Sequence, residues 1–80
     1  MDVTVKYFAN LRERMGRSDE TVNLEGDQAT VADLWAQLSG GEALPANILI
    51  AVNMEYKDAS AVVRGGDEVA FFPPVTGGAA

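Results

Sequence analysis

The chain has 80 residues, enough for one small domain with a thin hydrophobic core. Apolar residues make up 48% and charged residues 22% of the sequence, which is typical of a globular protein and argues against disorder. The formal net charge of −6, from 12 acidic and 6 basic residues, argues against nucleic-acid binding and favours partners with positive surfaces.

The sequence contains no cysteine and no histidine. This composition excludes disulfides, thiolate metal sites, a cysteine nucleophile and the commonest general base, and we expect no bound metal. The longest apolar runs are too short to cross a bilayer, and a strand pattern that begins at residue 3 leaves no room for a signal peptide. We therefore expect a cytoplasmic domain without membrane contact. If it takes part in chemistry, we expect it to do so as a substrate or carrier.

The N-terminal part of the sequence predicts a strand, a short helix and a second strand. Apolar and polar side chains alternate over residues 3–8, as in a half-buried strand. Leu11 and Met15 are four residues apart and Gly16 follows, which predicts one or two helical turns. Alternation resumes over residues 20–24 and predicts the second strand, with residues 25–28 as a loop.

The strongest local pattern is that of an amphipathic helix. Thr30 and Asp33 have the spacing of a capping box. Apolar residues follow at i, i+3, i+4 and i+7, namely Val31, Leu34, Trp35 and Leu38. Two glycines after Ser39 end the helix. Because Trp35 belongs to this apolar stripe, we expect it in the core and not in a binding site.

Three more strands are predicted in the second half of the chain, over residues 47–53, 56–57 and 68–72. Asn53 tolerates a positive φ and so favours a turn between the first two of these strands.

This order of elements predicts an α+β roll, with a mixed sheet of about five strands, one main helix and one short helix. We expect the first and last strands to lie side by side in the middle of the sheet, which is the β-grasp (ubiquitin-like) arrangement. The predicted domain covers residues 1–72.

Strand alternation places two aromatic side chains away from the predicted core. If Tyr7 and Phe71 pack under the helix, Phe8 and Phe72 lie on the opposite face of the sheet. A β-grasp has one main helix, so that face is open to water. An exposed aromatic pair is typical of a protein interface. The alternative is that a bulge or the short helix covers Phe8.

Residues 73–80 form a predicted extended tail. Two prolines end the last strand and stiffen the chain where it leaves the sheet, and the tail carries no charged side chain. Because glycine has no Cβ, Gly77 and Gly78 can pass through a narrow channel and approach another molecule's reactive groups. A frayed terminus would instead be expected to carry serine, lysine or glutamate.

Residues 65–78 read GGDEVAFFPPVTGG, residues 3–9 read VTVKYFA, and residues 51–53 read AVN. These segments resemble the small subunit of molybdopterin synthase, a ubiquitin-like sulfur carrier. The resemblance covers nearly the whole chain. Its most specific part is the last strand running into Phe-Phe-Pro-Pro-Val-Thr-Gly-Gly.

The resemblance implies that an activating enzyme (an adenylyltransferase), using ATP and magnesium, adenylates the carboxylate of the C-terminal glycine. A sulfur donor then converts the adenylate to a thiocarboxylate. The large synthase subunit holds the active site, where the sulfur passes to cyclic pyranopterin monophosphate and builds the molybdopterin dithiolene. This chain would be a non-catalytic carrier that binds no cofactor itself, in a heterotetramer of two small and two large subunits.

By the same resemblance, Gly78 carries the sulfur and Gly77 provides clearance. The residues implied in partner binding are Phe8, Phe72, Pro73, Pro74, Val75 and Thr76. Ala79 and Ala80 depart from the family, in which the chain ends at Gly78, and they put a peptide bond where the carboxylate belongs. They are a segment that a peptidase trims, two added residues, or the mark of a variant that carries no sulfur.

Two other functions stay open on the sequence. One is a related ubiquitin-like carrier that serves thiamine synthesis, another thiolation pathway or protein conjugation. The other is a binding module whose tail does no chemistry. The Phe-Phe-Pro-Pro-Val-Thr segment favours the molybdopterin carrier over a related ubiquitin-like carrier. The state of the C-terminus separates both kinds of carrier from a binding module.

Overall fold

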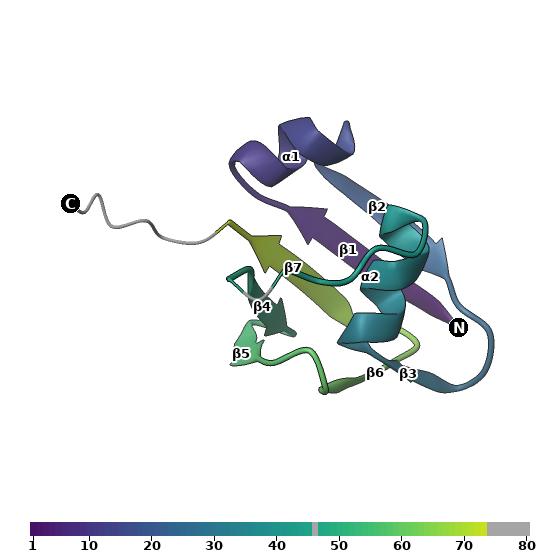
Figure 1. Cartoon of the computed structure of the whole chain (residues 1–80). Coiled ribbons are helices and arrows are strands. Elements are labelled where there is room, and N and C mark those ends of the chain that lie inside the picture. Colours follow the sequence, from purple (N-terminus) through teal and green to yellow (C-terminus); the bar gives the residue numbers. More distant parts are fainter. Residues whose placement is uncertain (46, 74–80) are drawn as a thin grey trace.

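The computed structural model describes residues 1–45 and 47–73 of the chain (Figure 1). Its elements, in chain order, are β1 (Asp2–Tyr7), α1 (Asn10–Met15), β2 (Asp19–Asn23), β3 (Gln28–Thr30), α2 (Val31–Ser39), β4 (Leu49–Val52), β5 (Glu55–Lys57), β6 (Val62–Arg64) and β7 (Glu68–Phe72). All the predicted strands and both predicted helices are present, with bounds that agree to within two residues.

Five strands form one mixed sheet in the order β2-β1-β7-β4-β5. The first and last strands, β1 and β7, are parallel neighbours in its middle, and the other pairs are antiparallel. Figure 1 shows α2 lying across one face of this sheet and α1 at the end of β1. The predicted β-grasp arrangement is therefore confirmed.

A second, two-stranded sheet was not predicted. It pairs β3 with β6, with Ala29 opposite Val63. Each strand has three residues, which is too short for alternation to show in the sequence, and their pairing joins segments more than 30 residues apart. Gln28, expected in a loop, is the first residue of β3.

The core lies between α2 and the sheet. The side chain of Trp35 is 1% exposed and meets the ring of Phe71 edge to face, with 5.0 Å between ring centroids. The helix begins with the predicted capping box, in which the Asp33 amide donates to Thr30 Oγ1 (3.1 Å) and the Thr30 amide donates to the Asp33 carboxylate (3.2 Å). The predicted core position of Trp35 is confirmed.

Candidate functional site

The face of the large sheet opposite α2 is covered by no helix of the described chain, and we call it the open face. Phe8 and Phe72 stack on it, with ring centroids 4.6 Å apart and ring planes 10° from parallel. Phe8 is 41% exposed and Phe72 is half-buried. The expected exposed aromatic pair is thus present, and neither a bulge nor α1 covers Phe8.

A groove of about 350 Å³ lies beside this pair, and we call it the open-face groove. Its lining comes from β1 and the residue after it, from β4, β5 and β7, and from the turn between β4 and β5: Lys6, Phe8, Ala51, Met54, Tyr56, Glu68, Ala70 and Phe72. Ala51 and Ala70 are opposite each other across β4 and β7. Because both side chains end at Cβ, they leave a hollow between the larger side chains around them.

The two charged groups of the groove are paired with each other. Lys6 Nζ lies 3.5 Å from Glu68 Oε2, across the parallel strands β1 and β7. This ion pair leaves the rest of the lining largely apolar or aromatic. A protein surface with apolar side chains fits such a groove better than a small charged ligand does.

Sequence reasoning did not identify Met54 and Tyr56 as part of this surface. They are 91% and 75% exposed, and the Tyr56 ring is tilted toward Phe72 with 6.4 Å between centroids. The face that each side chain takes depends on the register of β4 and β5, in which Tyr56 is opposite Ala51. A strand of three residues gives no alternation from which that register could be read.

Of the predicted tail, only Pro73 lies among the described residues, half-buried directly after β7. The other predicted site residues, Pro74, Val75, Thr76, Gly77 and Gly78, lie outside them. Since β7 ends at Phe72, the chain leaves the sheet next to the aromatic pair. The predicted tail therefore begins, at Pro73, next to the aromatic pair.

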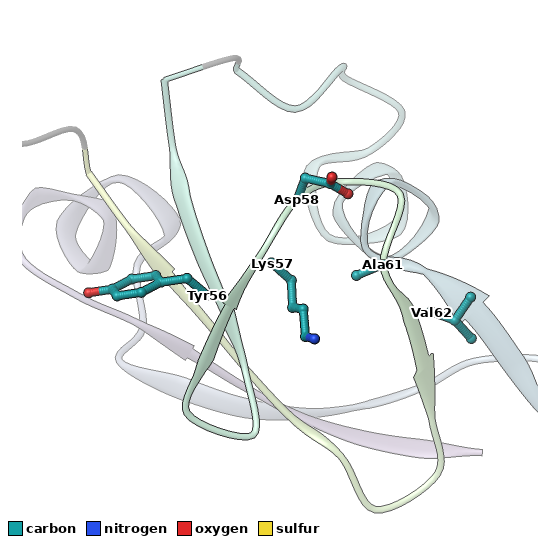
Figure 2. Close-up of a pocket in the computed structure, with 5 residues that line it drawn as sticks. All are labelled: Tyr56, Lys57, Asp58, Ala61 and Val62. Carbon is teal, nitrogen blue, oxygen red and sulfur yellow. The ribbon is translucent and has the colours of Figure 1, made fainter.

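A larger hollow of about 570 Å³ lies between β5 and β6, lined by Tyr56, Lys57, Asp58, Ala61 and Val62 (Figure 2). Figure 2 shows the Tyr56 ring pointing away from the side chains of Lys57 and Val62. Lys57 pairs with Glu55 at 3.5 Å. Asp58 accepts hydrogen bonds from the hydroxyl and amide of Ser60, which lower its pKa. These polar groups satisfy one another, so we assign no chemistry to this hollow.

The most perturbed titratable group of the described chain is the phenol of Tyr7. It donates a hydrogen bond to Glu20 Oε2 (2.7 Å), and Arg17 forms an ion pair with the same carboxylate. Burial, followed by the bond to Glu20, raises the pKa of Tyr7 well above its usual value. The phenol is therefore a neutral donor that ties β1 to β2, and Tyr7 lines neither the open-face groove nor the hollow between β5 and β6.

Residues 1–45 and 47–73 contain neither of two other kinds of feature, a metal site or a membrane-spanning helix. No group of three metal-ligating side chains is placed to hold an ion there. No helix in that part of the chain is long and apolar enough to cross a membrane.

Comparisons with known proteins agree with the fold and extend through the tail. A model described as "ThiS family" matches residues 5–78. The chain is 39% identical to the molybdopterin synthase sulfur carrier subunit of Haemophilus influenzae, over 95% of this chain and 99% of that protein. It is similar to the crystal structure of SAMP1 from Haloferax volcanii, with a TM-score of 0.80, 32% identity and coverage of 96% and 99% of the two chains.

A third similar structure is a complex of subunits 1 and 2 of the molybdopterin-converting factor from Helicobacter pylori. Its matching chain has a TM-score of 0.65 and 23% identity, with coverage of 96% of this chain and 99% of that one. At this identity the likeness shows the fold.

Proposed function

The chain belongs to the ThiS family, and from that membership we propose that it is the sulfur carrier subunit of a molybdopterin synthase. The observation that carries the proposal is the extent of the match, which runs through the last strand and ends at Gly78, the second residue of the Gly-Gly pair. The near-complete coverage of the Haemophilus influenzae carrier subunit supports it.

The composition supports a carboxyl group as the sulfur-bearing group. A chain without cysteine cannot hold sulfur as a persulfide. In a form of the chain that ends at Gly78, the terminal carboxylate attacks the α-phosphorus of ATP and releases pyrophosphate. A hydrosulfide-equivalent donor then displaces AMP from the acyl adenylate and leaves the thiocarboxylate. ATP and magnesium are bound by the activating enzyme in this proposal.

The open face supplies the docking surface for the large synthase subunit. Phe8 and Phe72 are already stacked and partly exposed in the free chain, so docking buries them without rearrangement. The chain leaves the sheet directly after Phe72, which starts the tail at the edge of the docked surface. Gly77 and Gly78 then enter the large subunit, where the sulfur passes to the pterin. The Haemophilus influenzae relative is named as a subunit of molybdopterin synthase, which supports a large-subunit partner.

We expect Phe72→Ala to weaken the affinity for the large subunit by about 1–3 kcal/mol, since it removes a half-buried aromatic anchor from the docking surface. The stability of the isolated domain should change less, because Phe72 is not part of the core. Titration calorimetry with the purified large subunit measures the effect. Val62→Ala is the matched control, since Val62 is 42% exposed and lies outside the open-face groove. Equal affinities for wild type and F72A would remove Phe72 from the interface.

Reconstitution tests the function as a whole. The chain ending at Gly78 is incubated with the activating enzyme, ATP, magnesium and a sulfur source, and then with the large subunit and cyclic pyranopterin monophosphate. We expect a thiocarboxylate to form in the first step and to disappear in the second, as the dithiolene product appears. A thiocarboxylate that persists in the presence of the large subunit and the pterin would contradict the assignment to molybdopterin synthase.

The similarity to SAMP1 favours protein modification as a second candidate function. A related Haloferax volcanii structure carries the name small archaeal modifier protein 1. A modifier would place the same Gly78 carboxyl group on an amine of another protein. The product of that reaction is a larger protein species joined by an amide, which gel electrophoresis of a cell extract separates from the free carrier. Carriage of sulfur for thiamine synthesis and a tail without chemistry stay as the remaining alternatives.

A further inference from the structure

Met54 has the most exposed of the large apolar side chains in residues 1–45 and 47–73, at 91%. It lies in the turn between β4 and β5 and forms part of the rim of the open-face groove. An isolated exposed methionine would need no explanation. Met54 borders a groove that is also lined by Phe8, Tyr56 and Phe72, so its side chain enlarges an existing apolar surface.

The backbone at Met54 is unfavourable for a residue with a side chain. Asn53 has φ 50° and Met54 has φ 71°, so both lie in the left-handed region. A two-residue hairpin turn of this kind favours Asn followed by Gly. Asn at the first position agrees with that preference and Met at the second does not, because its Cβ is crowded at positive φ. The domain therefore gives up stability to hold a methionine here.

Hydrogen bonds to the segment between β6 and β7 hold the β4–β5 turn in this left-handed backbone conformation. The Asn53 side chain accepts a hydrogen bond from the Glu68 amide (2.9 Å) and donates one to the Asp67 carboxylate (3.1 Å). The Asn53 amide donates to the Glu68 carbonyl (2.8 Å). Asp67 also accepts from the Arg64 amide (2.8 Å). The hydrogen bond from the Arg64 amide, followed by the one from the Asn53 side chain, holds the pKa of Asp67 below its usual value, so the carboxylate stays ionised near neutral pH.

We propose that Met54 is a partner-contact residue, held at the rim of the open-face groove at a cost in domain stability, and that it packs against an apolar side chain of the large synthase subunit. This inference rests on the proposed function. The fixed turn presents the side chain at a constant place, while the unbranched thioether chain adapts its shape to the partner.

Substitution of Met54 separates its effect on the stability of the domain from its effect on the affinity for the large subunit. Met54→Gly removes the side chain and is compatible with a positive φ, so we expect the melting temperature to rise by roughly 2–6 °C. We expect the affinity for the purified large subunit to fall about 10-fold, because the variant loses an apolar contact that docking would bury. Met54→Leu keeps an apolar side chain of similar volume in the same backbone and should bind within about 3-fold of wild type.

The affinities of M54G, M54L and F72A, and the melting temperature of M54G, decide between the possible roles of Met54. Wild-type affinity for M54G, with F72A weakened, would overturn the contact at Met54 and leave the proposed function standing. Wild-type affinity for both M54G and F72A would overturn the docking surface itself. An M54L variant as weak as M54G would show that an apolar contact is not what Met54 provides. A melting temperature of M54G below that of wild type would overturn the cost in stability.

Discussion

The W35A variant is expected to be largely unfolded at room temperature, having lost about 3–5 kcal/mol of stability. Trp35 is 1% exposed, lies between α2 and the sheet, and meets Phe71 edge to face at 5.0 Å between centroids. Truncation to alanine removes the largest buried side chain and leaves a cavity that the surrounding strands fill only in part. A core as small as that of an 80-residue chain supplies a total of about this size.

Urea denaturation followed by far-UV circular dichroism measures this loss without relying on tryptophan fluorescence. Trp35→Phe is the matched control. The Trp35 indole N–H forms no hydrogen bond with the described residues, so phenylalanine removes an unpaired buried donor while keeping an aromatic ring. We expect W35F to lose less than half as much stability as W35A. A W35A variant with near-normal stability would contradict the assignment of Trp35 to the core.

The parts of the fold that depend on local patterns could be predicted from the sequence. The alternation around Val5 and Tyr7 defines β1, and the spacing of Thr30 and Asp33 defines the start of α2. Once these two elements are known, the face that carries Phe8 follows from the pleat. The pairing of Phe8 with Phe72 could therefore be predicted before the structure, and it is present.

The parts that depend on register or on distant pairing could not be predicted. The sheet of β3 and β6 forms because three-residue segments far apart in the chain meet, and neither segment shows a strand pattern alone. The groove exists because Ala51 and Ala70 are opposite each other, which is a consequence of how β4 pairs with β7. The places of Tyr56 and Met54 on its rim follow from the β4–β5 turn. A single sequence contains no signal for these registers.

The second large effect concerns the tail. We expect the 80-residue chain to be activated at least about 100-fold more slowly than a chain that ends at Gly78. In the longer chain the only terminal carboxylate belongs to Ala80, and on an extended chain it lies about 7 Å beyond the place of the Gly78 carboxylate. A displacement of about 1 Å is enough to cost about 100-fold in rate at a reacting centre.

ATP-dependent adenylate formation with the activating enzyme measures this difference. The chain ending at Gly78 with Gly78→Ala is the matched control, because it keeps the length and tests the need for glycine. Removal of Ala79 and Ala80 should leave the melting temperature unchanged, since β7 ends at Phe72 and the described core contains no residue after Phe71. Equal rates for the two lengths, without cleavage of the longer chain, would show that Gly78 is not the activated residue.

The central claim is that Gly78 carries the sulfur as a thiocarboxylate, and intact-mass measurement tests it most directly. The chain ending at Gly78 is incubated with the activating enzyme, magnesium and a sulfur source, with and without ATP. Replacement of one oxygen by one sulfur adds about 16 Da, and we predict this gain only with ATP, and on the C-terminal peptide that contains Gly78. An unchanged mass under conditions in which the enzyme activates a known carrier, or a gain of about 16 Da on any other peptide, would contradict the claim.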